Sequence, residues 1–218
     1  MEIFLDCLPC MLRQALDASR MVTDRADVRE KILDDALATV SRYRDYRCSP
    51  DLCRDIHRAV KAHTGVADPY AQIKRQNIEA ALDLLPSLLD FVRAKQEDLY
   101  WALKVAATGN VMDSALYRGV YSADFIRRDL EAPFAVCDLA AFEDKLQNAR
   151  RVVIIADNSG ETVFDRVLIQ RLRAPGTFYA VRSEPILNDA TEAEAYASGL
   201  GEVAAVVSTG CDAPGAML

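Results

Sequence analysis

The chain has 218 residues, which is enough for one large domain or two small ones with a substantial hydrophobic core. Its composition, 51% hydrophobic and 27% charged, is typical of a soluble globular protein. The formal net charge is −7, and acidic residues are spread along the chain. This charge argues against nucleic acid as the main partner and gives no general attraction to anionic membranes.

The sequence contains no sign of a membrane or secretory segment. No apolar run approaches the ~20 residues of a membrane span. Residues 1–6 lack the basic lead and the long apolar stretch of a signal peptide. Six cysteines are too few for a disulfide scaffold, so we expect them to be reduced. We therefore predict a cytoplasmic protein.

Residues 1–130 are predicted to be almost wholly helical. Apolar residues recur at helical spacing over 8–19 and again over 28–40. Two later helices are expected to start at the sequences Ser49-Pro50-Asp51 and Asp68-Pro69-Tyr70, where a capping residue precedes proline. Pro86 is predicted to break or restart the second of these helices, and Gly109 to end the helical run that follows.

From Phe134 onward the pattern changes to strands that alternate with helices. Strands are predicted over 152–156, 177–182 and 202–208, with helices over 162–173 and 191–199; a further strand over 134–136 and a helix over 139–148 would precede them. This alternation predicts right-handed parallel crossovers in a three-layer α/β unit. The last strand has no covering helix, so we expect that the chain is cut short or is completed by a partner.

Polar residues follow the first predicted strand. Asp157 and Asn158 come directly after the apolar run, Ser159-Gly160 turns the chain, and Glu161 begins a helix. Ligands collect at the carboxyl ends of parallel strands, where a carboxylate beside an amide offers two hard oxygen ligands to a divalent cation. The free N–H groups of the new helix could face a phosphate. The alternative is ordinary turn chemistry.

Two further polar clusters fit the same picture. Arg182 ends the second predicted strand and Asp189 lies in its loop; with Asp157 and Asn158, Asp189 would form an oxygen-rich site suited to Mg²⁺ or Mn²⁺. Arg182 could clamp a phosphate through its planar guanidinium group. The alternatives are that residues 188–191 cap a helix, and that the third cluster, 108–113, is a turn between helices.

Taken together, these motifs resemble those of one family. The motifs, in order, are Cys7-x-x-Cys10, Asp68-Pro69-Tyr70-x-x-x-Lys74, Gly109-Asn110-x-x-Asp113, Asp157-Asn158-x-Gly160-Glu161 and Arg182-x-x-Pro185-x-x-Asn188-Asp189-x-Thr191. The family is the damage-control phosphatases, formerly a domain of unknown function, whose metal-binding domain also occurs in proteins described as acidic-residue methyltransferases. The paired cysteines resemble its prokaryotic branch.

The resemblance implies an N-terminal multihelical domain, residues 1–130, joined to a Rossmann-like three-layer α/β/α domain, residues 131–218, that is truncated at its C-terminus. It implies metal-dependent hydrolysis of small phosphomonoesters, such as sugar phosphates or damaged phosphometabolites, by metal-activated water. The metal would be of the Mg, Mn, Co or Ni class, held by Asp157, Asn158 and Asp189. Family members typically continue to a further strand and a Lys-Gly-rich loop, and this sequence ends before that loop.

Further residues receive roles in this hypothesis. Glu161, Asp113 and Arg182 are the candidates for catalysis, with Glu161 orienting or deprotonating water. The candidates for phosphate binding are Asn110, Arg182, Ser159 and Gly160. The alternative function is a non-catalytic protein that binds metal or phosphometabolites, or an inactive truncated homologue. A methyltransferase fits less well, because no glycine-rich loop follows the first strand of the α/β part.

The remaining cysteines and histidines leave alternatives open. The pairs Cys7/Cys10 and Cys48/Cys53 could supply four thiolates to zinc, or they are small core residues on helices. His57 and His63 lie on opposite sides of a helix and do not form a ligand pair. The expected partner is a small phosphorylated metabolite, with no nucleic acid and no membrane. Self-association through the uncovered sheet edge is possible.

Overall fold

The computed structural model describes the chain except residues 1, 97, 113–122, 173 and 216–218. Its contacts divide the chain into two compact units. The helical unit consists of residues 1–72, 182–187 and 210–218, and the sheet unit of residues 73–181 and 188–209. The predicted boundary near residue 130 followed the change from helices to strands. The contacts instead assign the helices from residue 73 onward to the unit that contains the sheet.

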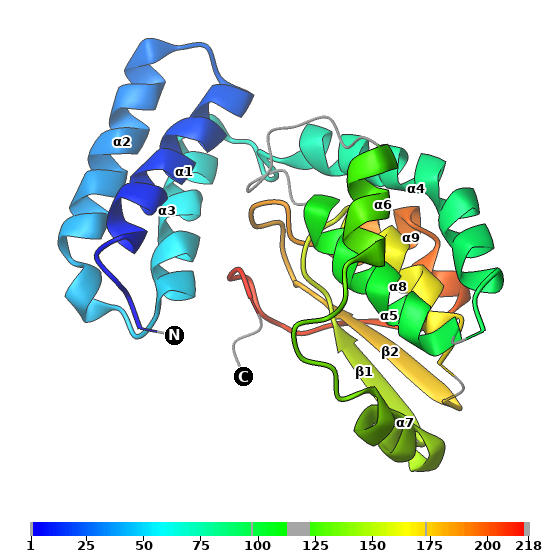
Figure 1. Ribbon diagram of the computed structural model, residues 1–218. Helices are drawn as coiled ribbons and strands as arrows, with labels where there is room; N and C mark the ends of the chain where they lie inside the picture. The colour runs from blue at the N-terminus through cyan, green and yellow to red at the C-terminus, as the bar shows by residue number, and fades with distance from the viewer. Residues whose placement is uncertain (1, 97, 113–122, 173, 216–218) are drawn as a thin grey trace. The chain divides into compact units, whose positions relative to one another are not determined.

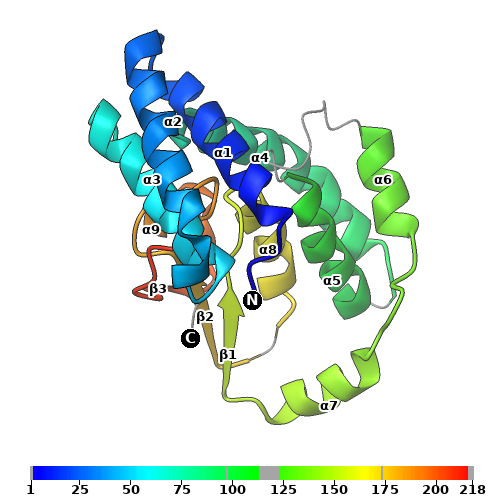
Figure 2. The same cartoon turned by 90° about the vertical axis from the view of Figure 1, so that its left-hand side faces the viewer.

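The helical unit is built on three helices that lie side by side, α1 (Cys7–Val22), α2 (Ala26–Ser41) and α3 (Ser49–Thr64), with a short 3-10 helix, η1 (Tyr43–Asp45) (Figures 1 and 2). The apolar faces predicted from helical spacing form its core, which includes Met11, Ala15, Ile32, Ala36, Val40, Leu52, Ile56 and Val60. α3 begins one residue earlier than predicted, with Cys48 at its N-cap. It ends at Gly65, whose φ of +70° favours glycine.

The sheet unit contains a three-stranded parallel sheet in the order β1-β2-β3, which confirms the predicted parallel α/β architecture. Its strands are β1 (Arg151–Ile155), β2 (Gly176–Val181) and β3 (Ala205–Ser208), linked through α8 (Glu161–Ile169) and α9 (Glu192–Ala197). Ile154 pairs in register with Tyr179, and Tyr179 with Val206, so the three share one face. This face packs against the apolar side of α8.

The other helices of the sheet unit are α4 (Ala71–Arg93), α5 (Asp98–Thr108), α6 (Ala123–Glu131) and α7 (Leu139–Asn148), with the 3-10 helices η2 (Gly109–Met112) and η3 (Leu200–Glu202). α5 packs along α8. α7 matches the helix predicted over 139–148. On the opposite face of β1, Val153 and Ile155 are 60% and 50% exposed.

Pro86 does not break its helix, contrary to prediction: α4 runs without interruption to Arg93. The proline removes the backbone hydrogen bond to the carbonyl group of Leu82. Buried apolar residues lie on both sides of it, namely Ile78, Ala81, Leu88 and Val92. Continuing the helix buries all four in one core, and this burial outweighs one lost hydrogen bond.

Two predicted strand segments are also different. Residues 134–136 form no strand; the ring of Phe134 instead packs edge-on against Tyr100, with 5.6 Å between ring centroids. The third strand was predicted from residue 202 but begins at Ala205. Gly199, with a φ of +80°, precedes η3, and this turn occupies the residues before the strand. Among the described residues, no helix is long and apolar enough to cross a membrane.

Candidate active site at the carboxyl end of the sheet

The loops that follow β1 and β2 are fastened together by backbone hydrogen bonds. Asn158 and Asp189 form an isolated antiparallel bridge. The N–H of Ser159 donates to the carbonyl of Asn188 at 2.8 Å, and the N–H of Ala190 donates to the carbonyl of Asp157 at 2.8 Å. The sheet unit therefore brings together Asp157, Asn158 and Asp189, the three residues predicted as metal ligands.

These three residues offer two carboxylates and one amide oxygen. Asn158 and Asp189 are 2% and 5% exposed, whereas Asp157 is exposed to solvent. The amide oxygen of Asn158 accepts the backbone N–H of Glu161 at 3.2 Å, and a carbonyl oxygen has a second lone pair for another partner. A set of hard oxygen donors with one side open to water fits the chemistry of Mg²⁺ or Mn²⁺.

Glu161 is held between two amide side chains. Its carboxylate accepts Nδ2 of Asn110 at 3.1 Å and Nδ2 of Asn158 at 3.0 Å. Asn110 reaches it because Gly109, at the end of α5, lies close to α8. A Cβ at Gly109 would come within 2.9 Å of both Glu161 Cγ and Phe164 Cβ. The polar segment after α5 and the first turn of α8 thus meet, and the predicted candidates Asn110 and Glu161 are neighbours.

Ser159 is a buried polar group at the start of α8. Its side chain is fully buried, and its hydroxyl has no hydrogen-bond partner among the described residues. Gly160 occupies the N-cap of α8 and, as a glycine, has no side chain that could cap the helix. The N–H of Glu161 donates to Asn158 Oδ1 instead. The other N–H groups in the first turn of α8, beside a hydroxyl without a partner, favour an anion such as a phosphate.

Asp165 and Tyr179 form a buried pair that the sequence reasoning missed. The hydroxyl of Tyr179 donates to Oδ2 of Asp165 at 2.6 Å. Burial raises the pKa of Asp165 to about 7, and the negative charge of Asp157 adds to this, although the Tyr179 hydrogen bond opposes it. Burial and the charge of Asp165 raise the pKa of Tyr179 well above its usual value. One sequence feature could have drawn attention to Asp165. It lies four residues after Glu161, and this spacing places both carboxylates on the same face of α8.

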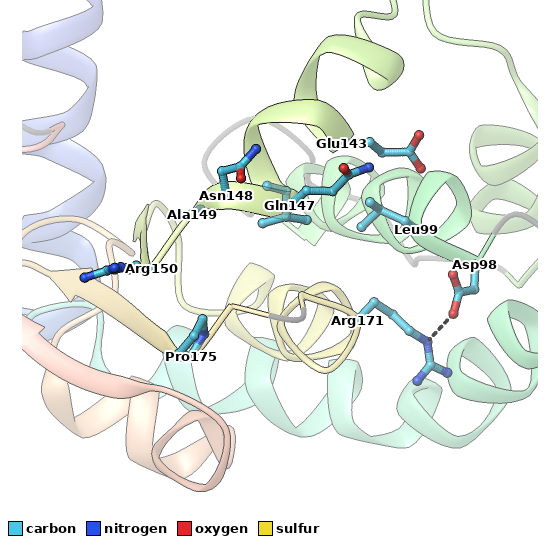
Figure 3. A pocket seen from close by; sticks show the side chains of 10 residues that line it. Asp98, Leu99, Glu143, Gln147, Asn148, Ala149, Arg150, Arg171 and Pro175 are labelled. Atoms are coloured by element: carbon cyan, nitrogen blue, oxygen red, sulfur yellow. Dashed lines mark ion pairs between the residues drawn. The ribbon is translucent and has the colours of Figure 1, made fainter.

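Two cavities of useful size are lined by described residues of the sheet unit. One, of about 470 Å³, is lined by Glu161 and Asp165 together with mainly apolar residues of α5, α7, β1 and the segment before α7. The other, of about 780 Å³, lies by the amino end of β1 and the end of α7 (Figure 3). Its lining includes Asp98, Arg150 and Arg171, and an ion pair joins Asp98 to Arg171 at 3.8 Å.

Two further residues, Asp113 and Arg182, were predicted to be catalytic. Asp113 lies outside the described residues. Arg182 directly follows β2 and is 2% exposed, but it belongs to the helical unit. The roles of both residues stay predictions.

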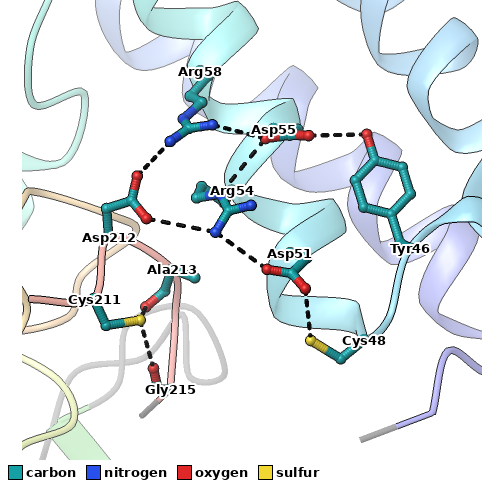
Figure 4. Close-up of polar contacts among 10 residues, drawn as sticks. All are labelled: Tyr46, Cys48, Asp51, Arg54, Asp55, Arg58, Cys211, Asp212, Ala213 and Gly215. Atoms are coloured by element: carbon teal, nitrogen blue, oxygen red, sulfur yellow. Dashed lines mark hydrogen bonds and ion pairs between the residues drawn. The ribbon is translucent and has the colours of Figure 1, made fainter. Parts of the chain in front are cut away.

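Ion pairs join the C-terminal segment of the helical unit to α3 (Figure 4). Asp212 contacts Arg58 at 2.6 Å and Arg54 at 3.6 Å. The segment 182–187 also packs here, since Lys61 Nζ donates to the carbonyl of Pro185 at 2.6 Å. Pairs at this level of exposure each stabilise a protein by about 0–1 kcal/mol. Together, these contacts hold the segments around Asp212 and Pro185 against α3 within the helical unit.

Cys10, Cys48 and Cys53 of the helical unit take part in hydrogen bonds. The thiol of Cys48 donates to Asp51 at 3.3 Å, and that of Cys53 donates to Gln14 at 3.3 Å. Gln14 in turn donates to Cys10 Sγ at 3.6 Å. Within the part of the chain that the structure describes, no three His, Cys, Asp or Glu side chains gather as a metal cluster. A zinc site at Cys7 and Cys10 stays a prediction.

Comparisons with known proteins show what the whole chain is similar to. The model of the damage-control phosphatase ARMT1-like domain matches residues 3–218. The crystal structure of a DUF89 family protein from Pyrococcus horikoshii has a TM-score of 0.84 and 25% sequence identity, over 99% of this chain and 76% of that one.

Sequence relatives give the same result. A damage-control phosphatase from Archaeoglobus fulgidus is 28% identical over 94% of this chain and 73% of its own length. A damage-control phosphatase from Pyrococcus horikoshii is 26% identical over 96% of this chain and 74% of its own length. An uncharacterised protein from Methanocaldococcus jannaschii is 28% identical over 98% of this chain. These names support a phosphatase-type function, and the match over residues 3–218 shows that the chain belongs to the damage-control phosphatase ARMT1-like domain family.

Proposed function

We propose that this protein is a metal-dependent phosphatase that hydrolyses small phosphomonoesters at the carboxyl end of its sheet. The bridge between Asn158 and Asp189 carries this proposal, because it joins the two loops that hold the candidate metal ligands. The buried hydroxyl of Ser159 and the start of α8 lie on the same loop and supply donors suited to a phosphate. Phosphoryl transfer to water requires metal ligands and hydrogen-bond donors to the phosphate in one place, and the carboxyl end of this sheet offers both.

Asp157, Asn158 and Asp189 would hold the divalent cation. A cation of the Mg, Mn, Co or Ni class, when bound, would offset charge on the phosphoryl oxygens and lower the pKa of water. The observation that favours this group is the donor set itself. Two carboxylates and an amide oxygen are hard ligands, and one of the carboxylates, that of Asp157, is exposed to solvent.

Glu161 is the candidate base. Its two oxygens are each fixed by one amide donor, so the carboxylate is oriented while lone pairs remain for a water molecule. In the proposed reaction the water oxygen forms a bond to phosphorus and the ester P–O bond breaks. One proton of the water passes to Glu161, and the alcohol leaves with a proton from solvent. Ser159 and the N–H groups of α8 would hold the phosphoryl oxygens during this step.

The test is a phosphatase assay of the full chain with p-nitrophenyl phosphate, after chelation and after addition of Mg²⁺, Mn²⁺, Co²⁺ or Ni²⁺ in turn. We expect turnover that requires added metal and that falls at least about 100-fold in Asp189→Asn. The exchange keeps the size and removes the charge. Metal binding without turnover would instead support the alternative, a protein that binds metal or phosphometabolites without catalysis.

A further inference from the structure

A cavity of about 470 Å³ lies beside Glu161 of the candidate site. Its size falls in the range of small-molecule pockets. Glu161 and Asp165 line it, and Glu161 is also bonded to Asn158 in the candidate metal site. One carboxylate therefore borders both the place proposed for the phosphoryl group and the cavity. A ligand held at the start of α8 could extend into this space.

The walls of the cavity are mainly apolar. Three aromatic residues line it, Tyr100, Phe134 and Phe142, along with aliphatic side chains of α5, α7 and β1. Among the described residues that line it there is no Lys or Arg. Lys104 Nζ lies 4.6 Å from the centre of the Phe134 ring and is itself buried. Such walls do not suit a phosphate. Beyond the carboxylates of Asp138, Glu161 and Asp165 and the hydroxyl of Tyr100, they offer sugar hydroxyls few hydrogen-bond partners.

The other cavity of the sheet unit has the opposite character. It lies by the amino end of β1, and charged groups, Asp98, Glu143, Arg150 and Arg171, contribute to its lining (Figure 3). It contains none of the residues of the candidate site. The helix α7 contributes to both cavities: Phe142 lines the apolar one, and Leu146, one turn later, lines the charged one.

We propose that the apolar cavity binds the organic part of the substrate, and that this part is aromatic or aliphatic rather than rich in hydroxyl groups. The inference rests on the proposed function, because the phosphate is placed at the start of α8. The substrates would then be phosphomonoesters of apolar alcohols. Among the substrate classes suggested by the sequence, this choice disfavours simple sugar phosphates.

The binding test compares 3-phenylpropylphosphonate with methylphosphonate by calorimetry on the full chain, with Mn²⁺ present. Both carry the same anionic group, and only the first can fill the cavity. Wild type should bind the phenylpropyl compound at least tenfold more tightly. Phe142→Ala should lose most of this preference, with methylphosphonate binding unchanged. Leu146→Ala is the matched control, since it truncates a half-buried side chain on the same helix and should keep the preference.

Equal affinities in wild type, no binding of either compound, or a preference that survives Phe142→Ala would overturn the inference. Turnover of 2-phenylethyl phosphate and ribose 5-phosphate, which both release a primary alcohol, separates the inference from the proposed function. Preferential binding with hydrolysis of neither ester would refute the phosphatase but leave the cavity assignment standing. Equal kcat/KM for both esters without a binding preference would leave the phosphatase and refute the assignment.

Discussion

The helical unit and the sheet unit differ in where their polar side chains gather and in how deeply these are buried. In the helical unit, polar contacts concentrate around α3, where arginines pair with Asp51, Asp55 and Asp212 near the surface. In the sheet unit, buried polar side chains gather at the ends of β1 and β2, including Asn158, Ser159 and Asp189. Burying polar groups costs free energy, so a cluster of them at the carboxyl end of the sheet supports the proposed binding site.

The two units also contain buried titratable groups of opposite kind. In the helical unit, burial and the positive charge of Lys61 lower the pKa of His57 to about 4. In the sheet unit, burial raises the pKa of Asp165 to about 7. Both groups are neutral in the folded state over part of the same pH range, but they respond to pH in opposite directions. We therefore expect acid to weaken the helical unit and base to weaken the sheet unit.

The largest expected effect concerns Glu161, the first residue of α8. Glu161→Gln should lower kcat about a thousandfold, because the amide cannot accept a proton from water. Metal binding should change little. Glu192→Gln is the matched control, since Glu192 is exposed and is the first residue of α9, as Glu161 is of α8. Similar losses in the two variants would refute a role of Glu161 as base.

Asp165→Asn should remove the sensitivity of the sheet unit to base. The folded-state pKa of about 7 exceeds the ordinary value of 3.8 for an aspartate. This group's contribution to stability is therefore complete below about pH 3.8 and is lost as pH rises through about 7. Between pH 5 and pH 8 the variant should gain roughly 2–3 kcal/mol relative to wild type in the free energy of unfolding. Denaturant unfolding at the two pH values measures this gain.

Asp129→Asn is the control for this prediction. Asp129 is half-buried in the same unit and also accepts a hydroxyl hydrogen bond, from Thr108 at 2.7 Å. A gain of equal size in this control would contradict burial of Asp165 as the cause.

His57→Phe should remove the sensitivity of the helical unit to acid. The folded-state pKa of about 4 lies below the ordinary value of 6.5 for a histidine. The contribution of this group to stability is therefore complete above about pH 6.5 and is lost as pH falls toward 4. Wild type should lose about 2 kcal/mol between pH 7.5 and pH 5 through this group, and the variant should not. Amide exchange of α1–α3 reports on this unit separately from the sheet.

The control for the histidine lies on the same helix. His63 contacts Asp35 at 2.7 Å and is partly exposed, so His63→Phe should keep the acid-dependent loss. If His57→Phe still shows the loss, another group is responsible.

The smallest expected effect concerns the contact between η2 and α8. Gly109→Ala would place a Cβ 2.9 Å from Phe164 Cβ, an atom that the helix holds in place. We expect a loss of about 1–3 kcal/mol in unfolding free energy, with a lower kcat as Glu161 is displaced. Gly176→Ala is the control, because its Cβ would meet no atom closer than 3.5 Å. A thermal melt and a kinetic assay of both variants decide between local strain and a general intolerance of alanine.

Much of this arrangement could be predicted from sequence, because local patterns determine it. The apolar run of β1 and the polar residues after it predicted both the strand and the cluster at its end. Pro86 was misjudged because a local rule does not register the buried residues on both sides of it. Asp165 pairs with Tyr179 across two elements, α8 and β2. The spacing from Glu161 places Asp165 on a helix face, but it does not predict a contact with another element. Cavities are likewise formed only by tertiary packing.

The most direct test of the candidate site is the metal content of the purified protein, by elemental analysis after exposure to Mn²⁺ and removal of excess metal. Wild type should be compared with Asp157→Ala, Asp189→Ala and Cys7→Ser. We predict roughly one equivalent in wild type and in Cys7→Ser, and loss of the metal in both aspartate variants. Metal that persists in both aspartate variants, or that disappears with Cys7→Ser, would contradict a metal centre at the carboxyl end of the sheet.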